Sequence, residues 1–278
     1  MSVLLAGCGD LGTEAALRFA ATGRRVVALR RSAERLPAAV EGRSVDLARQ
    51  VPEVPGDTDI VVIVVTADRR TADGYRSTYV DGLANTLAGV ERAGARPSRV
   101  LLVSSTSVYG TDDGSWVDED TLAEPASATG SVLVEAERTL HDRVPGSIVL
   151  RLAGLYGPGR GALLERVRDG VPVSNAASYT NRIHRDDAAA AIVHLTTRVD
   201  EPAAVYLGAD HAPVTRGEIV RFLAGQLDVP APELERAGSP RGKRFRNDRL
   251  VASGFTFEYP TYREGYRAVL AGHGTPHR

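Results

Sequence analysis

The chain has 278 residues, of which 43% are hydrophobic and 25% charged, a composition typical of a folded globular protein. Its 34 Lys plus Arg and 35 Asp plus Glu give a net charge of −1, which argues against a nucleic-acid or anionic-membrane binder. The single cysteine, Cys8, excludes an internal disulfide framework, and the six histidines show no metal-ligand spacing. No signal peptide or membrane-spanning run is evident, so we expect a cytoplasmic protein without a metal site.

Short apolar runs alternate with amphipathic segments through the first half of the chain. The predicted strands cover 3–7, 25–30, 59–67, 99–106 and 147–154, and the predicted helices cover 13–23, 75–94 and 127–140. The runs at 61–65 and 100–103 contain no polar residues, which is typical of strands buried on both faces of a parallel sheet. This alternation predicts an α/β fold with a Rossmann-type, doubly wound parallel sheet.

The signals become shorter after residue 155. Helices are predicted near 162–170, 185–198, 216–228 and 262–271, and a strand near 204–210. We therefore predict a dinucleotide-binding Rossmann domain over 1–155 and a smaller substrate-binding region over 156–278. Elements near 183–210 are expected to return to the Rossmann sheet.

The stretch "AGCGDLG" places Gly7, Gly9 and Gly12 in a G-x-G-x-x-G pattern between a strand and a helix. In that context the first glycine allows a tight turn, the second admits a pyrophosphate, and the third lets helix and strand pack closely. The helix N-terminus, with Asp10 and Leu11, offers free N–H groups to the phosphates. The alternative is a turn that needs three glycines for packing alone.

The end of the second predicted strand bears on cofactor choice. An NAD site usually has a carboxylate about 20 residues past the glycines, but here Arg30, Arg31 and Ser32 occupy that place. Guanidinium groups suit a 2′-phosphate, so we predict NADP(H) rather than NAD(H). The alternative is a pair of solvated surface arginines. Weaker candidates for the adenine end are Asp46, Leu47, Thr66 and Ala67.

Three further stretches carry a family resemblance: "LLVSSTSVYG" (101–110), "LRLAGLYGPGR" (150–160) and "NRIHRDDAAAAIVHL" (181–195). With the glycine loop, they resemble the extended and atypical short-chain dehydrogenases/reductases, nearest to the NAD(P)-dependent epimerase/dehydratase proteins. The resemblance implies a Rossmann fold and a nicotinamide cofactor. It also implies a homodimer paired through the helices at 75–94 and 128–141.

The resemblance also implies a catalytic set, from which this sequence departs. The family's Ser/Thr falls on Ser105, with Ser104 as a neighbour that is easily confused with it. The usual Tyr-x-x-x-Lys aligns with Thr129 and Leu133, and a threonine hydroxyl cannot replace a phenol as a proton donor. Satisfaction of local backbone groups is the alternative role for the two serines.

Other residues are candidates for the missing functions. Tyr109 is the first candidate for proton donor, with packing of its loop as the alternative. Tyr156 and His184 are substrate-side candidates, with a wedge between the two regions as the alternative for Tyr156 and helix docking as the alternative for His184. Arg160 and Arg182 suit an anionic or hydroxylated substrate, or else form surface ion pairs.

The leading hypothesis is an NADP(H)-dependent oxidoreductase of the atypical short-chain type that acts on a small carbonyl, imine or alcohol. Alternatives are a non-catalytic NADP(H)-binding sensor or partner protein, epimerase or dehydratase chemistry, and non-redox chemistry in the same cleft. The basic run at 241–249 is interpreted as a solvated face or a substrate lip.

Overall fold

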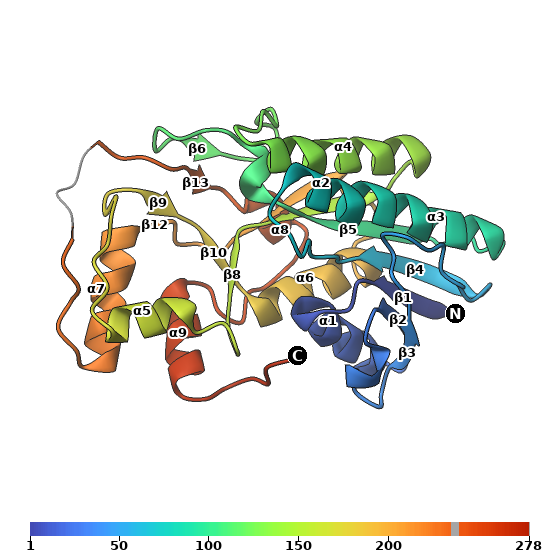
Figure 1. Ribbon diagram of the computed structural model, residues 1–278, viewed down its shortest axis with the longest axis horizontal. Coiled ribbons are helices and arrows are strands. Elements are labelled where there is room, and N and C mark those ends of the chain that lie inside the picture. The colour runs from blue at the N-terminus through green and yellow to red at the C-terminus, as the bar shows by residue number, and fades with distance from the viewer. Residues whose placement is uncertain (235–238, 278) are drawn as a thin grey trace.

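The computed structural model describes residues 1–234 and 239–277 of the chain. The strands of the central sheet are β1 (Ser2–Ala6), β2 (Arg25–Arg30), β3 (Glu41–Ser44), β4 (Thr58–Ile63), β5 (Arg99–Ser105), β7 (Ile148–Leu152) and β11 (Val205–Gly208). All seven are parallel and lie in the order β3-β2-β1-β4-β5-β7-β11 (Figure 1). The strand order reverses direction at β1, as in a doubly wound sheet. The predicted Rossmann-type fold class is confirmed.

Helices cover both faces of this sheet (Figure 1). They are α1 (Asp10–Ala21) and α6 (Arg185–Thr197) on one face, and α3 (Gly82–Arg92) and α4 (Ala128–Arg143) on the other. Successive strand residues point to opposite faces. In β1, Val3 and Leu5 therefore pack with the first pair of helices, and Leu4 and Ala6 pack with the second. Burial on both faces explains why this strand has no polar alternation.

The structure differs from the sequence-based elements in three places. The helix expected over 75–94 consists of α2 (Ala72–Tyr75), the π-helical segment η2 (Arg76–Asp81) and α3. The strand expected over 59–67 ends at Ile63, because the chain then turns to pass over Gly7. Strand β3 escaped prediction because its sequence, EGRS, is polar and mostly exposed at the sheet edge.

Segment η2 and helix α3 lie beside α4 on the outer face (Figure 1). The Arg76 guanidinium donates to both carboxylate oxygens of Glu135 at 2.6 Å, and Arg143 donates to Glu91 at 2.7 Å. These exposed ion pairs connect the helices through which a dimer is expected. The homodimer itself stays a prediction.

The C-terminal region stands beside the sheet, over the carboxyl ends of its strands (Figure 1). Its helices are α5 (Ala162–Arg168), α7 (Arg216–Leu227) and α9 (Tyr262–Leu270), while α8 (Asp248–Ala252) packs beside β11 of the main sheet. Three short strand pairs accompany them: β8 (Gly154–Tyr156) with β10 (Arg182–His184), β9 (Tyr179–Thr180) with β12 (Val214–Thr215), and β6 (Trp116–Val117) with β13 (Arg244–Phe245). Strand β11 pairs with β7 of the main sheet. The division into 1–155 and 156–278 stays a prediction.

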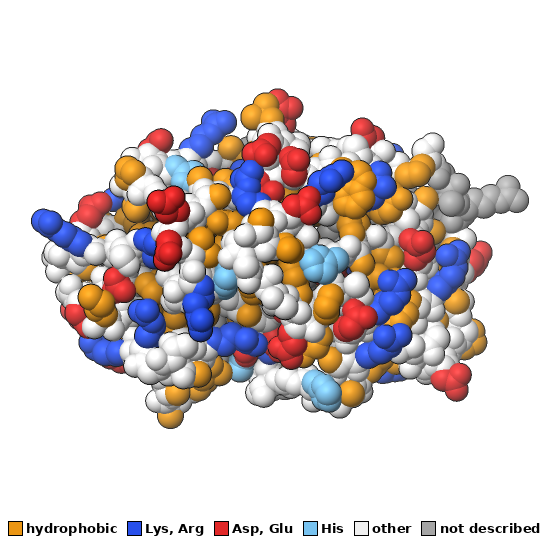
Figure 2. All heavy atoms as spheres, turned by 180° about the vertical axis from the view of Figure 1, so that it is seen from behind, with side chains coloured by type: hydrophobic (Ala, Val, Ile, Leu, Met, Phe, Trp, Pro, Cys, Tyr) orange, Lys and Arg blue, Asp and Glu red, His pale blue; other side chains and the backbone are white. Residues whose placement is uncertain are grey.

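Surface features agree with the sequence composition. Figure 2 shows acidic and basic side chains interspersed over the face seen there. Within residues 1–234 and 239–277, no helix is long and apolar enough to cross a membrane. The same residues contain no group of three or more His, Cys, Asp or Glu side chains that could hold a metal ion.

Candidate functional site

The glycine loop joins β1 to α1, and each of its glycines has a different environment. Gly7 has a φ of +88°, and a Cβ there would lie 2.7 Å from Val65 Cγ1. A Cβ on Gly12 would lie 2.7 Å from the carbonyl oxygen of Gly7. A Cβ on Gly9, in contrast, would meet no atom within 4 Å. Gly7 and Gly12 are therefore required by packing, whereas Gly9 leaves open space above the first turn of α1.

That open space suits a dinucleotide. Gly9 is the N-cap of α1 and supplies no side-chain cap, so the first N–H groups of the helix are left for another acceptor. A helix N-terminus with glycine in this position binds phosphate through backbone N–H groups and the positive end of the helix dipole. The loop therefore fits the pyrophosphate of a nicotinamide dinucleotide.

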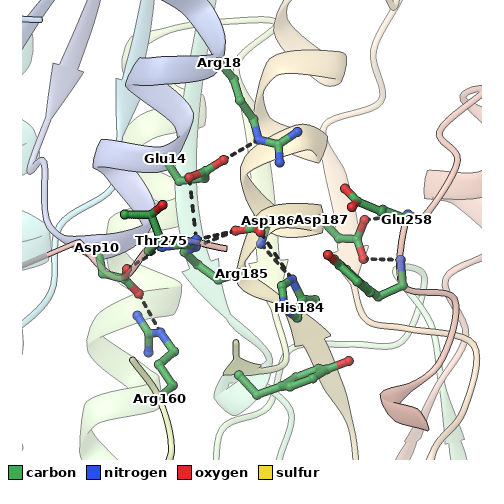
Figure 3. Close-up of polar contacts among 12 residues, drawn as sticks. Asp10, Glu14, Arg18, Arg160, His184, Arg185, Asp186, Asp187, Glu258 and Thr275 are labelled. Carbon is green, nitrogen blue, oxygen red and sulfur yellow. Dashed lines mark hydrogen bonds and ion pairs between the residues drawn. The ribbon is translucent and has the colours of Figure 1, made fainter. Parts of the chain in front are cut away.

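A group of charged residues contacts the first turn of α1 (Figure 3). Arg185, at the start of α6, is completely buried and donates to Asp10 at 2.9 Å and to Asp186 at 2.7 Å. Arg160 donates to the other carboxylate oxygen of Asp10 at 2.7 Å. Arg160, a candidate substrate ligand, thus forms an ion pair at the edge of the glycine loop.

The C-terminal tail joins the same group of residues. The carbonyl oxygen of Thr275 accepts a hydrogen bond from Arg185 at 2.9 Å (Figure 3). His277 lies 2.9 Å from Glu14, one turn further along α1. The beginning and the end of the chain therefore meet at the helix that follows the glycine loop.

At the other side of the glycine loop, β2 ends in the residues expected to choose between cofactors. Arg31 forms a two-pronged ion pair with Asp68, with N–O distances of 2.5 and 2.8 Å. Asp68 follows β4, so this pair connects the ends of two strands. Both side chains are more than half exposed. The expected partner of Arg31, a 2′-phosphate, would have to compete with Asp68.

The remaining candidates for the adenine end lie nearby but make local contacts. Asp46 accepts from the backbone N–H of Ala48, and Leu47 is buried. Thr66 is exposed and Ala67 is half-buried in the segment between β4 and Asp68. Ser32 is the N-cap of the short 3-10 helix η1 (Ala33–Arg35). Their roles at the adenine end of the cofactor stay predictions.

The end of β5 contains a buried polar network that the motifs did not reveal. Ser104 donates to Glu137 of α4 at 2.5 Å, and Arg151 of β7 donates to the same carboxylate at 2.7 Å. Arg151 also donates to the Tyr109 hydroxyl at 2.6 Å. Tyr109 is only 2% exposed, and burial raises the pKa of its phenol. This placement favours the packing role of Tyr109, and it directs Ser104 into the core.

Ser105 and Thr129 lie on the accessible side of the same region. Ser105 is half-buried, and its hydroxyl accepts a hydrogen bond from the backbone N–H of Ser107. The Thr129 hydroxyl lies 3.2 Å from that of Ser127, the N-cap of α4. Both are aliphatic hydroxyls, which are far weaker acids than a phenol, so neither can act as the proton donor near neutral pH.

Tyr156 and His184 belong to the interface between the two regions. The Tyr156 ring stacks on Tyr266 of α9, with centroids 4.5 Å apart, and is 3% exposed. His184 caps α6 by accepting from the Asp186 N–H, and burial lowers the pKa of its imidazole to about 4. The structure thus favours the packing and docking alternatives for these two residues.

Arg182 lines a cavity of about 330 Å³ between α5 and α7. Arg166 and Arg216 line the same cavity, together with the hydroxyl-bearing Thr180 and Ser174. Three guanidinium groups around one cavity suit an anionic group on a ligand.

Comparisons with known proteins agree with this geometry, although no protein-family model matches the chain. The Escherichia coli K12 protein YeeZ is 30% identical over 274 residues, which cover 93% of this chain and 96% of YeeZ. A solved structure from Methylobacillus flagellatus, assigned to the NAD-dependent epimerases/dehydratases, is 37% identical, with a TM-score of 0.81 and 98% of each chain covered. The chain belongs to the epimerase/dehydratase-like short-chain dehydrogenases/reductases.

Two more distant proteins are also similar to this chain. A Streptomyces protein named 3-diazoavenalumate denitrifying reductase is 28% identical over 306 residues, covering 95% of this chain and 99% of that protein. MoeE5, solved with UDP-glucose and NAD, has the same fold at 24% identity, with a TM-score of 0.77 and 96% of each chain covered. The family supports a nicotinamide cofactor and a role of the oxidoreductase or epimerase kind.

Several residues of this short-chain dehydrogenase/reductase were not singled out by the sequence. Arg185 and Glu137 stand on amphipathic helices, and their partners are far away in the chain. Asp68 lies in a polar loop without a motif. Lys243 was grouped with the basic run 241–249. The sequence alone could have identified Lys243 as unusual, because it is the only lysine in the chain.

One buried carboxyl group makes the stability of this family member depend on pH. Asp210 is 2% exposed, its Oδ2 has no hydrogen-bond partner among the described residues, and burial raises its pKa to about 7. The folded state therefore holds the proton that the unfolded chain loses near pH 4. Folding is favoured by this group below pH 4, and the benefit is lost as the pH rises through 7.

We expect Asp210→Asn to flatten that dependence. The free energy of unfolding of the variant, relative to wild type, should be larger at pH 8 than at pH 5 by about 2 kcal/mol. Chemical denaturation at the two pH values measures this difference and cancels any fixed cost of the amide. A constant difference between variant and wild type would show that Asp210 titrates normally.

Proposed function

We propose that the protein is an NADP(H)-dependent reductase of small carbonyl or imine compounds. The observation that carries the proposal is the open glycine loop, where Gly9 leaves space above the N-terminus of α1 and supplies no side-chain cap. Arg30 and Arg31 at the end of β2 support a cofactor with a 2′-phosphate. When bound, the nicotinamide supplies a hydride.

The protein's own residues would bind and orient the substrate. Ser105 is the hydroxyl at the end of β5 that is not directed into the core, and we propose that it holds the substrate oxygen or nitrogen. The arginine-lined cavity with Arg182 is proposed to receive a negatively charged group of the substrate. Arg160 is proposed to stay with Asp10, where it stabilises the loop rather than the substrate.

The first experiment is a fluorescence titration of nucleotide-free protein with NADPH and, in parallel, with NADH. The proposal expects tighter binding of NADPH, followed by NADPH oxidation in the presence of a suitable aldehyde, ketone or imine. Preference for NADH would contradict the role of the arginines and leave a nicotinamide enzyme. Absence of binding to either nucleotide would contradict the proposed function.

A non-catalytic NADP(H)-binding protein is the second candidate. The observation in its favour is the burial of Tyr109, which removes the nearest phenol from the end of β5. Under this alternative NADPH binds but is not oxidised by any substrate, and Ser105→Ala changes nothing. Under the proposed function Ser105→Ala lowers turnover and leaves NADPH binding intact.

The Arg31–Asp68 ion pair gives a separate prediction about cofactor choice. Asp68→Ala should free the guanidinium, and NADPH should then bind up to about fivefold more tightly, because exposed ion pairs are weak. The affinity for NADH should not change, because it has no 2′-phosphate. Parallel titrations of the variant with both nucleotides check this. Equal changes for NADPH and NADH would contradict it.

A further inference from the structure

Lys243 is the only lysine among the 34 basic residues of the sequence. It precedes β13 and is half-buried, whereas Arg241 and Arg246 of the same run are exposed. Every other Lys or Arg position of the chain holds arginine, and the two side chains differ in their acid–base chemistry. An ammonium group can release a proton near neutral pH when its surroundings lower its pKa, whereas a guanidinium cannot.

One amide fixes the backbone on both sides of Arg244, the residue that follows Lys243. Asn181 donates to the carbonyl oxygen of Lys243 at 2.8 Å and accepts from the N–H of Phe245 at 2.9 Å. The backbone N–H of Gly154 donates a hydrogen bond to the carbonyl oxygen of Asn181 at 3.1 Å. The segment carrying Lys243 is thereby attached to the chain just past β7, at the carboxyl end of the sheet.

The Lys243 side chain reaches the loop that follows β5. Its ammonium group donates to the backbone carbonyl oxygen of Tyr109, four residues after Ser105. The first turn of α4 packs against the same loop, since a Cβ on Gly130 would lie 2.8 Å from the Ser107 carbonyl oxygen. The loop that begins at Ser105 is therefore contacted by Lys243 at the Tyr109 carbonyl oxygen. Thr129 belongs to the helix turn that packs beside the same loop.

The position that aligns with the family lysine holds an apolar residue. Leu133 is buried in an apolar cluster that also contains Tyr109 and Phe245. No ammonium group reaches the loop from α4 at this position. Lys243 approaches the same cluster from the C-terminal region, two residues before Phe245.

The surroundings of Lys243 suit a proton donor. Burial lowers the pKa of its ammonium group, and the charge of Asp112 opposes this effect. Asp112 is itself engaged by the Arg241 guanidinium at 2.6 Å and the Gly242 N–H at 2.7 Å. A pocket of about 290 Å³, lined in part by these three residues and Tyr179, lies beside Lys243. The residue that precedes Lys243 in the chain, Gly242, thus lines a ligand-sized space.

We propose that Lys243 donates the proton to the carbonyl or imine group reduced at this site, an inference that rests on the proposed function. An N–H bond of the ammonium group breaks, and an O–H bond forms on a carbonyl oxygen or an N–H bond on an imine nitrogen. The adjacent carbon takes up the hydride supplied by NADPH. The substrate gains two electrons, and NADPH is oxidised to NADP⁺. The neutral amine then recovers a proton from water.

The first test observes the lysine directly. Protein labelled with carbon-13 at the lysine ε-position gives a single side-chain signal, because the chain has one lysine. We expect this signal to titrate below the ordinary lysine value of about 10.4 and to shift on saturation with NADP⁺. A signal that titrates normally and is unchanged by NADP⁺ would overturn the proposal.

The second test separates proton donation from a structural role. With para-nitrobenzaldehyde as probe, Lys243→Met and Lys243→Arg should each lower kcat by about 100-fold or more, while the NADPH Kd changes little. Arginine keeps the charge and the donor to Tyr109 but cannot release a proton. The control Arg246→Ala removes an exposed charge from the same segment and should leave kcat near wild type.

The outcomes distinguish this proposal from the proposed function. If wild-type protein does not bind NADPH, the proposed function fails, and the inference fails with it. If wild-type protein binds NADPH and reduces the probe while Lys243→Arg is equally active, only the role of Lys243 is overturned. Loss of activity in both variants, with loss of the alkaline limb of the wild-type pH profile, supports it.

Discussion

Replacement of Glu137 by alanine is expected to lower the free energy of unfolding by about 3–5 kcal/mol, because the Arg151 guanidinium would be left charged and buried without its partner. Glu137 is 4% exposed and Arg151 is 7% exposed. Ser104 also donates to this carboxylate, so its hydroxyl would lose its acceptor as well. The melting temperature should fall by roughly 10 °C.

The same helix offers a matched control. Glu135 forms a two-pronged ion pair with Arg76, but both side chains are largely exposed. Glu135→Ala should therefore change the melting temperature very little. The double variant Glu137→Ala, Arg151→Met removes both buried charges and should recover most of the lost stability. Equal destabilisation by Glu135→Ala and Glu137→Ala would contradict the importance of burial.

Gly9→Ala is expected to fold normally and to weaken NADPH binding by about 10- to 100-fold, because hydrogen bonds to charged groups contribute about 1.5–3 kcal/mol. The added methyl meets no protein atom within 4 Å and the backbone is extended, so the fold tolerates it. The same methyl occupies the space through which a pyrophosphate approaches the helix. Thermal unfolding and an NADPH titration measure the two effects separately.

Gly7→Ala is the control with the opposite signature. Its φ of +88° and the 2.8 Å contact with Val65 Cα require strain or movement of backbone when a Cβ is added. The variant should lose stability even without nucleotide. If Gly9→Ala binds NADPH as wild type does, the dinucleotide does not pass over this loop.

The sequence predicted the sheet well because every strand of it except β3 is a short apolar run, which is typical of a buried strand. Strand β3 has no such run, and its place at the sheet edge depends only on backbone pairing with β2. The glycine loop was also predictable, since its spacing and its position between a strand and a helix are local features. Local pattern and long-range structure agree there.

The polar part of the site was predicted less well, for a physical reason. The partners of Arg151, Arg31 and Arg185 lie 14, 37 and 175 residues away in sequence, respectively. A sequence shows which residues can ionise but not which of them meet, and burial then decides their chemistry. Tyr109 illustrates this, because its motif position suggests the cleft whereas its hydroxyl faces Arg151 in the core.

The meeting of both chain ends at α1 has a consequence for biosynthesis. Asp10 and Glu14 are translated early, but Asp10 pairs with Arg160 and Arg185, and Glu14 pairs with His277. A growing chain can form β1 and β2 around the glycine loop while these carboxylates stay exposed to water. The helix that is proposed to hold the cofactor acquires the contact with His277 only after that residue has left the ribosome, so we expect nucleotide binding only once this segment has been translated.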